Sequence, residues 1–507
     1  MSEKKPIALV ILDGFGYRKE KEGNAIALAH TPHLNHWFTR YPHTILQASG
    51  PAVGLPEGYV GNSEVGHITI GAGRIIEQTV TRINATIDDG TFFTNPTLIQ
   101  CLESARAGSN RLHIMGLLSD AGVHCLTKHI FAYLKAAHDH NIKEIYIHPF
   151  LDGRDAPPQS ARIYLTKLDA AIQQIGAGTI GSLHGRFYPM DRNRNWDRTE
   201  ISYHCLTSET KPLYSNWQTY IDEHYAERIT DEFMPPMLLN KDAIIKSGDA
   251  IICANFRPDR SRQLTAAFIL PDFNHFPISV KPLWFFTPVS YAPNLPTKTL
   301  LNNNAPLANT FTDVLHAHHK RFFAIAESEK YAHVTYFFKG GREKPYDTET
   351  QELIPSRTVR DYVNHPEMSA HEITNHVIAS LESDPADVYL INYANADMVG
   401  HSGNLQATIK AIEILDHELN RLYEQLVVKM GGTMYITGDH GNAELKVDPI
   451  TKQPHTAHTT NPVPFIIVSP HPPKLPAMKT LADIAPLMLT QLELPVPEAM
   501  QHHNLIL

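Results

Sequence analysis

The chain has 507 residues, of which 42% are hydrophobic and 19% are charged, and its net charge is −9. These proportions are typical of a globular protein with a sizeable core, and the length favours about two to four domains. No long basic run suggests a nucleic-acid partner, and no stretch approaches the length of an apolar membrane span. Four scattered cysteines without a CxxC pair, and an N-terminus without an apolar signal region, predict reduced thiols and a cytoplasmic location.

The first predicted element is a strand at residues 7–12, a continuous apolar run typical of a strand buried on both faces of a parallel sheet. It leads directly into Asp13. In open α/β sheets, groups that bind ligands lie at the carboxyl ends of the strands, so Asp13 stands where a metal ligand would be expected. The alternative for a single aspartate after a strand is an ordinary turn residue.

A stretch rich in turn-forming residues follows at 54–67. Gly61 precedes Asn62 and Ser63, and Gly66 comes three residues after Ser63. A serine on such a turn can expose its hydroxyl beside backbone N–H groups that are free to meet an anion. The alternative is a structural turn in which Ser63 is the N-cap of a helix.

From about residue 78, strands alternate with helices, which indicates a parallel α/β sheet. Strands are predicted at residues 112–118, 145–147, 180–183 and 250–254, and helices at 127–140 and 160–175. The loops after these strands carry His124, Arg154, Arg186, Arg192, Arg257 and Arg260. Guanidinium forks suit bidentate contacts with phosphate or carboxylate, so the strand ends together predict an anion pocket. Any one of these arginines alone would more often be a surface ion-pair partner.

A polar stretch with proline and asparagine at residues 293–306 is predicted to be a linker. Beyond it, strands are predicted at residues 321–327, 387–392, 433–437 and 465–468. A capping-box spacing at residues 369–372 predicts the start of a helix. A longer helix is predicted at residues 405–430, where leucine and isoleucine form one apolar stripe that would face the core.

Carboxylate and imidazole side chains recur at the expected strand ends of the two chain termini. Asp397 and His401 are four residues apart and would share one helical face. A set of oxygen and nitrogen ligands without thiolate suits Mn²⁺ or Zn²⁺ better than Mg²⁺ or Ca²⁺. Two metals beside a serine can activate its oxygen and stabilise in-line phosphoryl displacement, although each Asp–His pair alone could be a surface neighbour. The candidate ligands are Asp13, Asp397, His401, Asp439, His440, His455 and His458, with Ser63 as a further one.

Essentially from end to end, the chain resembles the cofactor-independent (2,3-bisphosphoglycerate-independent) phosphoglycerate mutases of the alkaline phosphatase superfamily. The motifs that carry the resemblance are LDGFG at 12–16, GNSEVGH at 61–67, LDGRD at 151–155, MDR at 190–192, NFR at 255–257, SEKYAH at 328–333, DMVGH at 397–401 and DHGNAE at 439–444.

The resemblance implies an α/β fold of two domains. A phosphatase-like metal-binding domain would comprise residues 1–77 and 311–507, and a transferase-like substrate domain, residues 78–310, would be inserted into it. Two divalent metals, with Mn²⁺ expected, would be held by Asp397, His401 and His458 and by Asp13, Ser63, Asp439 and His440. The substrate would be bound by His124, Arg154, Asp155, Arg186, Arg192, Arg257, Arg260 and Lys330.

The implied activity is the interconversion of 3-phosphoglycerate and 2-phosphoglycerate in glycolysis and gluconeogenesis, by a monomer. Ser63 would carry the phosphoryl group, and Asp155 is the candidate acid or base for the substrate hydroxyls. One alternative is a metal-dependent phosphomonoesterase, in which water intercepts the phosphoserine. The other is a non-catalytic phosphometabolite-binding protein, against which the complete ligand set argues.

A few positions depart from the family pattern without removing a catalytic group. They are Ala121, Cys125 with Leu126, Pro258, Lys339 and Ala396. Ala121 and Pro258 would bear on the pocket loops that carry His124 and Arg257.

Overall fold

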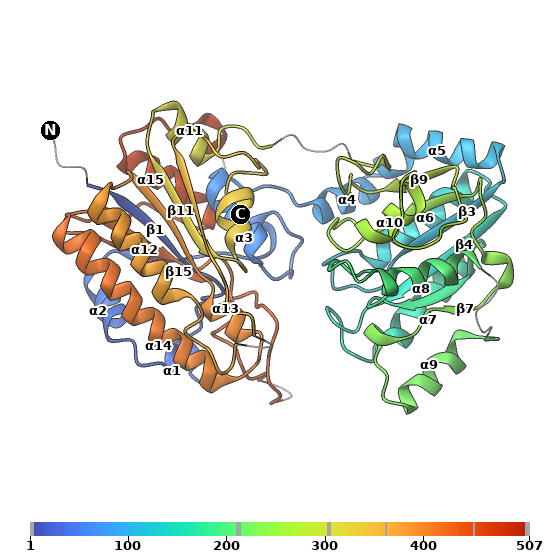
Figure 1. The fold of residues 1–507 in the computed structure, drawn as a ribbon, viewed down its shortest axis with the longest axis horizontal. Coiled ribbons are helices and arrows are strands. Elements are labelled where there is room, and N and C mark those ends of the chain that lie inside the picture. Colours follow the sequence, from blue (N-terminus) through green and yellow to red (C-terminus); the bar gives the residue numbers. More distant parts are fainter. Residues whose placement is uncertain (1–4, 209–213, 302–305, 360–361, 450–451, 502–507) are drawn as a thin grey trace. The chain divides into compact units, whose positions relative to one another are not determined.

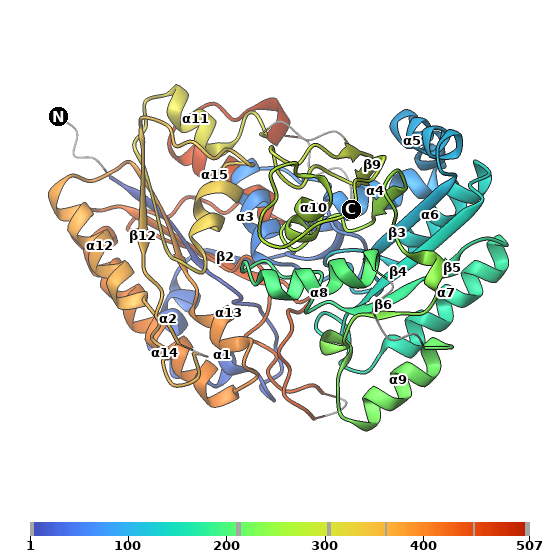
Figure 2. The same ribbon diagram turned by 45° about the vertical axis from the view of Figure 1, so that its right-hand side comes forward.

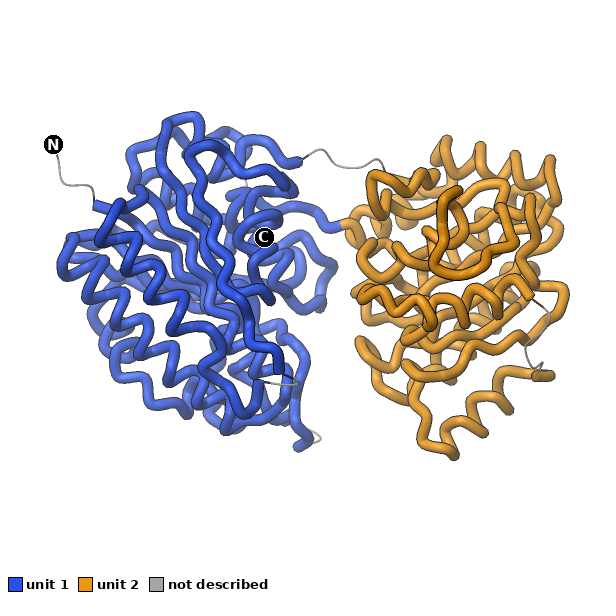
Figure 3. The backbone as a smooth tube through the Cα atoms, viewed as in Figure 1, with its two compact units in different colours: residues 1–78, 304–507 blue, residues 79–303 orange. Residues whose placement is uncertain are grey.

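The computed structural model describes residues 5–208, 214–301, 306–359, 362–449 and 452–501. The chain divides into two compact units: unit 1 comprises Met1–Gln78 and Asn304–Leu507, and unit 2 comprises Thr79–Asn303 (Figure 3). The expected domain boundaries were 77/78 and 310/311. Within the stretch predicted to be a linker, residues 302–305 lie outside the described residues, and Lys298–Thr299 forms the short strand β10.

Unit 1 is built on a sheet with the strand order β12-β11-β13-β1-β14-β15-β2. Strands β12, β11, β13, β1 and β14 pair in parallel, whereas the β14–β15 and β15–β2 pairs are antiparallel. The central strands are buried along their whole length, as continuous apolar runs predict. The strands are β1 (Ile7–Leu12), β2 (His43–Leu46), β11 (Phe322–Glu327), β12 (Glu349–Ile354), β13 (Val388–Tyr393), β14 (Thr433–Thr437) and β15 (Val463–Val468).

Helices cover both faces of this sheet (Figures 1 and 2). On one face lie α2 (Pro32–Arg40), α12 (Ala370–Ser383) and α14 (Leu405–Leu422), and on the other lie α3 (Ser63–Ala72), α11 (Phe311–Ala317) and α15 (Ile484–Gln491). Side chains from the first group pack on the strands: Trp37 and Leu415 share one core cluster with Val10. The predicted α/β class, with a mainly parallel sheet between helical layers, is confirmed.

Two predicted helices differ in detail from the structure. The apolar stripe of α14 lies against the core as predicted, but the α-helix ends at Leu422 and continues as a π-helix over Tyr423–Lys429. Helix α12 starts where the capping box predicted it, but the box itself does not form. The Ser369 hydroxyl donates to the carbonyl of Pro355 (3.0 Å) rather than accepting a backbone N–H of the helix.

Unit 2 contains a second sheet, with the order β10-β9-β8-β3-β4-β6-β7 and with β5 paired to β4. All its pairs are parallel except β6–β7. The predicted strand at residues 180–183 is divided between β5 (Thr179–Ile180) and β6 (Ser182–Gly185). The other strands are β3 (Arg111–Leu117), β4 (Glu144–Leu151), β7 (Met237–Leu238), β8 (Ala250–Cys253), β9 (Trp284–Thr287) and β10.

The helices of unit 2 pack in neighbouring pairs, α6 with α7 and α8 with α10. They are α4 (Thr79–Asp88), α5 (Pro96–Ala107), α6 (Thr127–Asp139), α7 (Ala161–Ile175), α8 (Trp196–Thr207), α9 (Trp217–Ala226) and α10 (Arg262–Ile269). All four cysteines are buried free thiols, as predicted. Within the described ranges, no helix is both long enough and apolar enough to cross a membrane.

Candidate active site

Ser63 is the first residue of α3, and Asn62 is the N-cap, whose side chain accepts a backbone N–H of the first turn. The alternative in which Ser63 itself caps the helix is therefore wrong. With the cap supplied by its neighbour, the Ser63 Oγ lies 3.0 Å from Asp13 Oδ1, 2.7 Å from Lys330 Nζ and 3.1 Å from His440 Nε2. The hydroxyl thus stands at the positive end of a helix, among a carboxylate, an ammonium and an imidazole.

The side chains around Ser63 come from adjacent strands of the unit 1 sheet. Asp13 follows β1, Lys330 follows β11, Asp439 follows β14, and Asp397 lies in α13 (Asn395–Gly400) just after β13. The carboxyl ends of parallel strands lie at one edge of a sheet, which brings these distant residues together. Gly14, with a φ of +72°, allows the close approach, because a Cβ there would lie 2.7 Å from the Asp397 Cα.

His401 and His458 converge on one carboxylate with their unprotonated nitrogens. The Nδ1 atoms lie 2.9 Å from the carbonyls of Thr456 and Gly61, respectively. Carbonyls only accept, so in the neutral rings Nδ1 carries the proton and Nε2 keeps its lone pair. The two Nε2 atoms are 3.1 Å apart, and each lies 3.2 Å from Asp397 Oδ1. Three lone-pair atoms therefore face one another without a proton to share, which is the arrangement that a metal cation satisfies.

A second set of ligand atoms comes from Asp13, Asp439 and His440, which lie within 4.8 Å of one another. In its neutral form His440 would have the same tautomer, because its Nδ1 lies 3.2 Å from the Gly441 carbonyl. Asp439 Oδ2 is buried without a hydrogen-bond partner among the described residues. His440 also groups within 4.8 Å with Asp397 and His458. The two predicted ligand sets are therefore adjacent, and His440 lies within reach of both.

The electrostatics of this cluster favour positive charge. Lys330 Nζ lies 2.6 Å from Asp13 Oδ1 and 2.7 Å from Asp397 Oδ2. Burial opposes the charge of Lys330, but these carboxylates outweigh it and raise the pKa of the ammonium. For His440, burial is likewise outweighed by the carboxylates, Asp439 foremost, which raise the pKa of the imidazole to about 10. A donor set of oxygens and imidazole nitrogens that attracts cations in this way fits divalent metals.

Several residues that hold the ligands were not predicted from the sequence. Asn392 donates to Asp13 Oδ2 (2.9 Å), and Asn442 donates to Asp397 Oδ1 (2.8 Å). The buried ammonium of Lys446 in turn donates to the Asn442 side-chain oxygen. A sequence signal existed for Asn392, because it is a polar residue inside an otherwise apolar strand. His455, offered as a possible ligand, belongs to neither ligand group of the described residues.

In unit 2, four of the predicted arginines line one cavity of about 290 Å³. They are Arg154, Arg186, Arg192 and Arg260, and Arg198, which was not predicted, joins them. Arg154 and Arg186 follow β4 and β6, and Arg192 and Arg260 precede α8 and α10, whereas Arg198 lies within α8. The strand-end argument therefore again brings distant residues together. The cavity therefore concentrates guanidinium groups, as an anion site requires.

The guanidiniums of this cavity differ in their partners. Arg186 is buried against Asp152 (2.7 Å) and Asp155, and Arg192 pairs with Asp259 (2.9 Å). Arg260 donates to the Met190 carbonyl (3.2 Å). Burial and the neighbouring arginines 192, 186 and 154 lower the pKa of Arg260 to about 10. An anionic ligand would relieve this crowding of positive charge.

Three predicted substrate residues of unit 2, His124, Asp155 and Arg257, are not in the lining of the cavity but contact residues in or beside it. The ring nitrogens of His124 are 3.9 Å from Asp155 and 3.8 Å from Asp259. Burial and the Arg186 guanidinium hold the pKa of His124 well below its usual value, so the ring is neutral. Arg257 pairs with Asp259 through its Nε (3.2 Å).

Three of the residues that depart from the family pattern, Lys339, Pro258 and Cys125, make contacts with neighbouring side chains or backbone groups. Lys339 is buried and forms an ion pair with Glu349 at 3.2 Å. Pro258 lies in the turn before α10, where its carbonyl accepts the N–H of Ser261 (3.0 Å). Cys125 is buried, with its thiol 3.4 Å from the Ala254 carbonyl. None of these contacts involves a predicted ligand or arginine.

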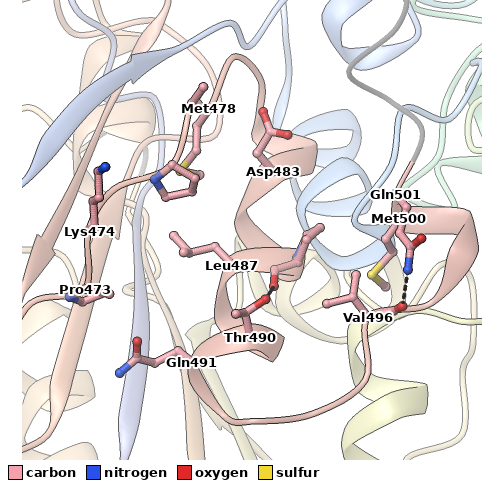
Figure 4. Close-up of a pocket in the computed structure, with 13 residues that line it drawn as sticks. Pro473, Lys474, Met478, Asp483, Leu487, Thr490, Gln491, Val496, Met500 and Gln501 are labelled. Carbon is pink, nitrogen blue, oxygen red and sulfur yellow. Dashed lines mark hydrogen bonds between the residues drawn. The ribbon is translucent and has the colours of Figure 1, made fainter.

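A larger hollow of about 520 Å³ in unit 1 lies between residues 473–478 and helix α15 (Figure 4). Its lining is mainly apolar, with several prolines, Met478, Leu487 and Met500. The carboxylate of Asp483 in its wall accepts the backbone N–H groups of Lys479 (2.7 Å) and Thr480 (2.9 Å), which is a helix-capping role. The hollow contains none of the predicted site residues.

Comparisons with known proteins agree along the whole chain. A family model described as "BPG-independent PGAM N-terminus" matches residues 83–293. The chain is 46% identical to the 2,3-bisphosphoglycerate-independent phosphoglycerate mutase of Acaryochloris marina, over 99% of this chain and 95% of that protein. It is 44% identical to mutase 1 of Methanosarcina barkeri, over 99% and 98%. A crystal structure of Leishmania mexicana phosphoglycerate mutase at low cobalt concentration matches with a TM-score of 0.80 and 30% identity, over 98% and 96%.

Proposed function

The chain belongs to the 2,3-bisphosphoglycerate-independent phosphoglycerate mutase family, and on that premise we propose that it interconverts 3-phosphoglycerate and 2-phosphoglycerate through a phosphoserine on Ser63. The observation that carries this proposal is the position of the Ser63 Oγ at the start of α3, in hydrogen-bond reach of Asp13, Lys330 and His440. A binding protein would not need a serine hydroxyl inside a cluster of carboxylates and imidazoles.

Two divalent cations, expected to be Mn²⁺, would occupy the donor sets of unit 1. When bound, they would supply positive charge that acidifies the serine hydroxyl and neutralises phosphoryl oxygens. One would be held by Asp397, His401 and His458, and the other by Asp13, Ser63, Asp439 and His440. The support for this assignment is that Nδ1 of each of the three histidines faces a backbone carbonyl, which leaves Nε2 as the nitrogen that can meet a cation. For His440 that cation would take the place of the proton that the neighbouring carboxylates favour.

The residues around Ser63 prepare its oxygen for attack on phosphorus. The hydroxyl donates to Asp13 Oδ1, and the Lys330 ammonium donates to the hydroxyl oxygen. As the proton leaves, the charge that develops on Oγ therefore meets a hydrogen-bond donor already in place. The N–H groups in the first turn of α3 offer further donors to the phosphoryl oxygens.

The arginine cavity of unit 2 would bind the anionic groups of the glycerate. In the first step the Ser63 hydroxyl passes its proton to Asp13, to which it already donates, while the Oγ–P bond forms and the P–O bond to the 3-oxygen breaks. The 3-oxygen takes a proton from a protonated Asp155. In the second step Asp155 removes the proton of the 2-hydroxyl, whose oxygen attacks the phosphorus, and the released Ser63 oxygen takes its proton back from Asp13. Arg186, which contacts Asp155, would hold that carboxylate in position.

A direct test starts from metal-free protein that is reloaded with Mn²⁺ and given 3-phosphoglycerate without any bisphosphoglycerate. We expect 2-phosphoglycerate, detected with enolase, and little free phosphate, together with phosphoserine at residue 63 in acid-quenched samples. Free phosphate as the main product would establish a phosphomonoesterase instead. Binding of 3-phosphoglycerate without turnover under any divalent metal would indicate a binding protein. Light scattering tests the expected monomer, and fractionation of the source cells tests the expected cytoplasmic location.

A further inference from the structure

One carboxylate stands in the wall of the arginine cavity, where an anionic ligand would meet repulsion. It belongs to Glu232, in the 3₁₀ turn Asp231–Phe233, and its Oε1 lies 3.3 Å from Nη1 of Arg154. Its side chain is only 17% exposed, whereas that of Arg154 is 55% exposed. Solvation alone does not account for a largely covered negative charge in the wall of an anion site.

The backbone fixes Glu232 at this place. The Glu232 carbonyl accepts the N–H of Phe187 (3.0 Å), in the loop that carries Arg186. A Cβ on Gly153, next to Arg154, would lie 2.7 Å from the Glu232 nitrogen, and a Cβ on Gly185 would lie 2.5 Å from its carbonyl oxygen. Both arginine-bearing loops therefore pack directly on the Glu232 backbone, which fixes the point from which its carboxylate reaches the cavity wall.

The other carboxylate in the lining belongs to Asp191, and it accepts more hydrogen bonds than the carboxylate of Glu232 does. Asp191 accepts the backbone N–H groups of Asn193 (3.0 Å) and Asn195 (2.9 Å) and a side-chain N–H of Gln263 (3.1 Å). These contacts make it a structural residue of the loop before α8. The Glu232 carboxylate, across the described part of the chain, has its hydrogen bond to Arg154 alone. Its charge is therefore offset by one guanidinium and remains available to act on a ligand.

We propose that Glu232 sets how much negative charge the cavity accepts, favouring monophosphorylated hydroxy acids and disfavouring ligands with a second phosphoryl group. The proposal rests on the proposed function, in which the phosphoglycerate occupies this cavity. A fixed carboxylate repels a ligand in proportion to the charge of that ligand, so it discriminates by charge rather than by shape. At roughly 6 Å in a water-like dielectric, the repulsion is worth about a threefold change in affinity per unit of ligand charge.

The test is Glu232→Gln in the full-length protein, because glutamine keeps the shape and an oxygen for Arg154 but removes the charge. Calorimetry at fixed ionic strength measures the binding of inorganic phosphate, 3-phosphoglycerate and 2,3-bisphosphoglycerate. We expect the gain in affinity over wild type to increase along this series, with the bisphosphate gaining more than about tenfold relative to phosphate. The matched control is Glu103→Gln, which removes an exposed charge from α5 of the same unit and should change none of these affinities.

Each result has one interpretation. An equal gain for all three anions, or the same gain in Glu103→Gln, overturns charge selection by Glu232. A loss of affinity for all three would show that Glu232 acts only by positioning Arg154, and that also overturns it. If the wild-type protein binds none of the anions, the proposed substrate cavity fails together with this inference. A wild type that turns over phosphoglycerate but shows no charge-dependent gain in the variant overturns the Glu232 role alone.

Discussion

Replacing Lys330 with methionine should make unit 1 depend on metal for its stability. Its Nζ lies 2.6–2.7 Å from Asp13, Ser63 and Asp397, at a position only 5% exposed. Removing one partner of a buried ion pair leaves the opposite charge uncompensated, at a cost of about 3–5 kcal/mol. At about 2.1 cal/mol/K per residue, a unit of about 280 residues loses roughly 5–8 °C in Tm for that cost.

Calorimetric melting of the wild type and Lys330→Met, each with chelator and with saturating Mn²⁺, measures this dependence. With chelator the variant should melt about 5–8 °C below the wild type. With Mn²⁺ the difference should shrink, because the cations compensate the same carboxylates. The wild type should keep its fold after chelation, since Lys330 already supplies one positive charge to the cluster.

The control is Lys339→Met, which removes another buried lysine of unit 1. Lys339 pairs with Glu349 (3.2 Å), which belongs to neither ligand group of the described residues. Its replacement should lower the melting temperature by a similar amount with and without metal. If Lys330→Met shows the same difference from wild type under both conditions, the ammonium does not balance the charge of the ligand carboxylates, and the electrostatic account of the cluster is wrong.

Three further predictions concern the nucleophile, the anion cavity and acid stability. Ser63→Ala should show no measurable mutase turnover and no phosphoserine while its melting temperature stays near the wild-type value; near wild-type activity in the coupled assay would assign the phosphoryl group to another residue. Arg260→Ala should lose a charge-assisted contact of about 1.5–3 kcal/mol, a roughly ten- to hundredfold fall in kcat/KM, and should release more phosphate per 2-phosphoglycerate formed. An unchanged ratio of the two products would limit Arg260 to initial binding. Burial lowers the pKa of His129 in unit 2 to about 3. Between about pH 6.5 and 3 the unfolded chain therefore binds a proton at this residue that the folded chain does not bind. The free energy of unfolding should fall as the pH falls through this window. Urea unfolding of His129→Gln should therefore depend on pH less steeply than the wild type, by about 1.4 kcal/mol per pH unit, and equal slopes would contradict a neutral buried ring.

The strands that could be predicted from the sequence are those that are buried on both faces. Residues 7–12 and 433–437 are buried on both faces, so their apolar runs alone located β1 and β14. Strand β12 has the polar sequence Glu-Thr-Gln-Glu-Leu-Ile, because it lies at the edge of its sheet and is only partly covered. Strand β2 has four residues and also lies at an edge. Edge strands bury little apolar surface, so hydrophobic periodicity carries little information about them.

The same reasoning explains the helix ends. The stripe of α14 persisted through Leu426, and it correctly predicted which face meets the core. The change to π-helix at Tyr423 alters the backbone hydrogen bonds but keeps apolar residues on the buried side, so the pattern of residue types could not reveal it. The failed cap at Ser369 was decided by a tertiary acceptor, the Pro355 carbonyl, which no local spacing encodes.

The ligand cluster of unit 1 is suited to cations and the arginine cavity of unit 2 to anions. This difference decides which residues of each site can be recognised in the sequence. In unit 1 the ligands are themselves the unusual residues, carboxylates and imidazoles at strand ends, so their types point directly to cations. In unit 2 the arginines indicate an anionic ligand. The carboxylates that pair with them, such as Asp152 and Glu232, cannot be distinguished in the sequence from ordinary loop residues. Their significance depends on distances of 2.7 and 3.3 Å to particular guanidiniums, which arise only when β4 and β6 place their loops side by side. A sequence therefore indicates the charge that a ligand should carry, whereas the limit on that charge emerges from packing.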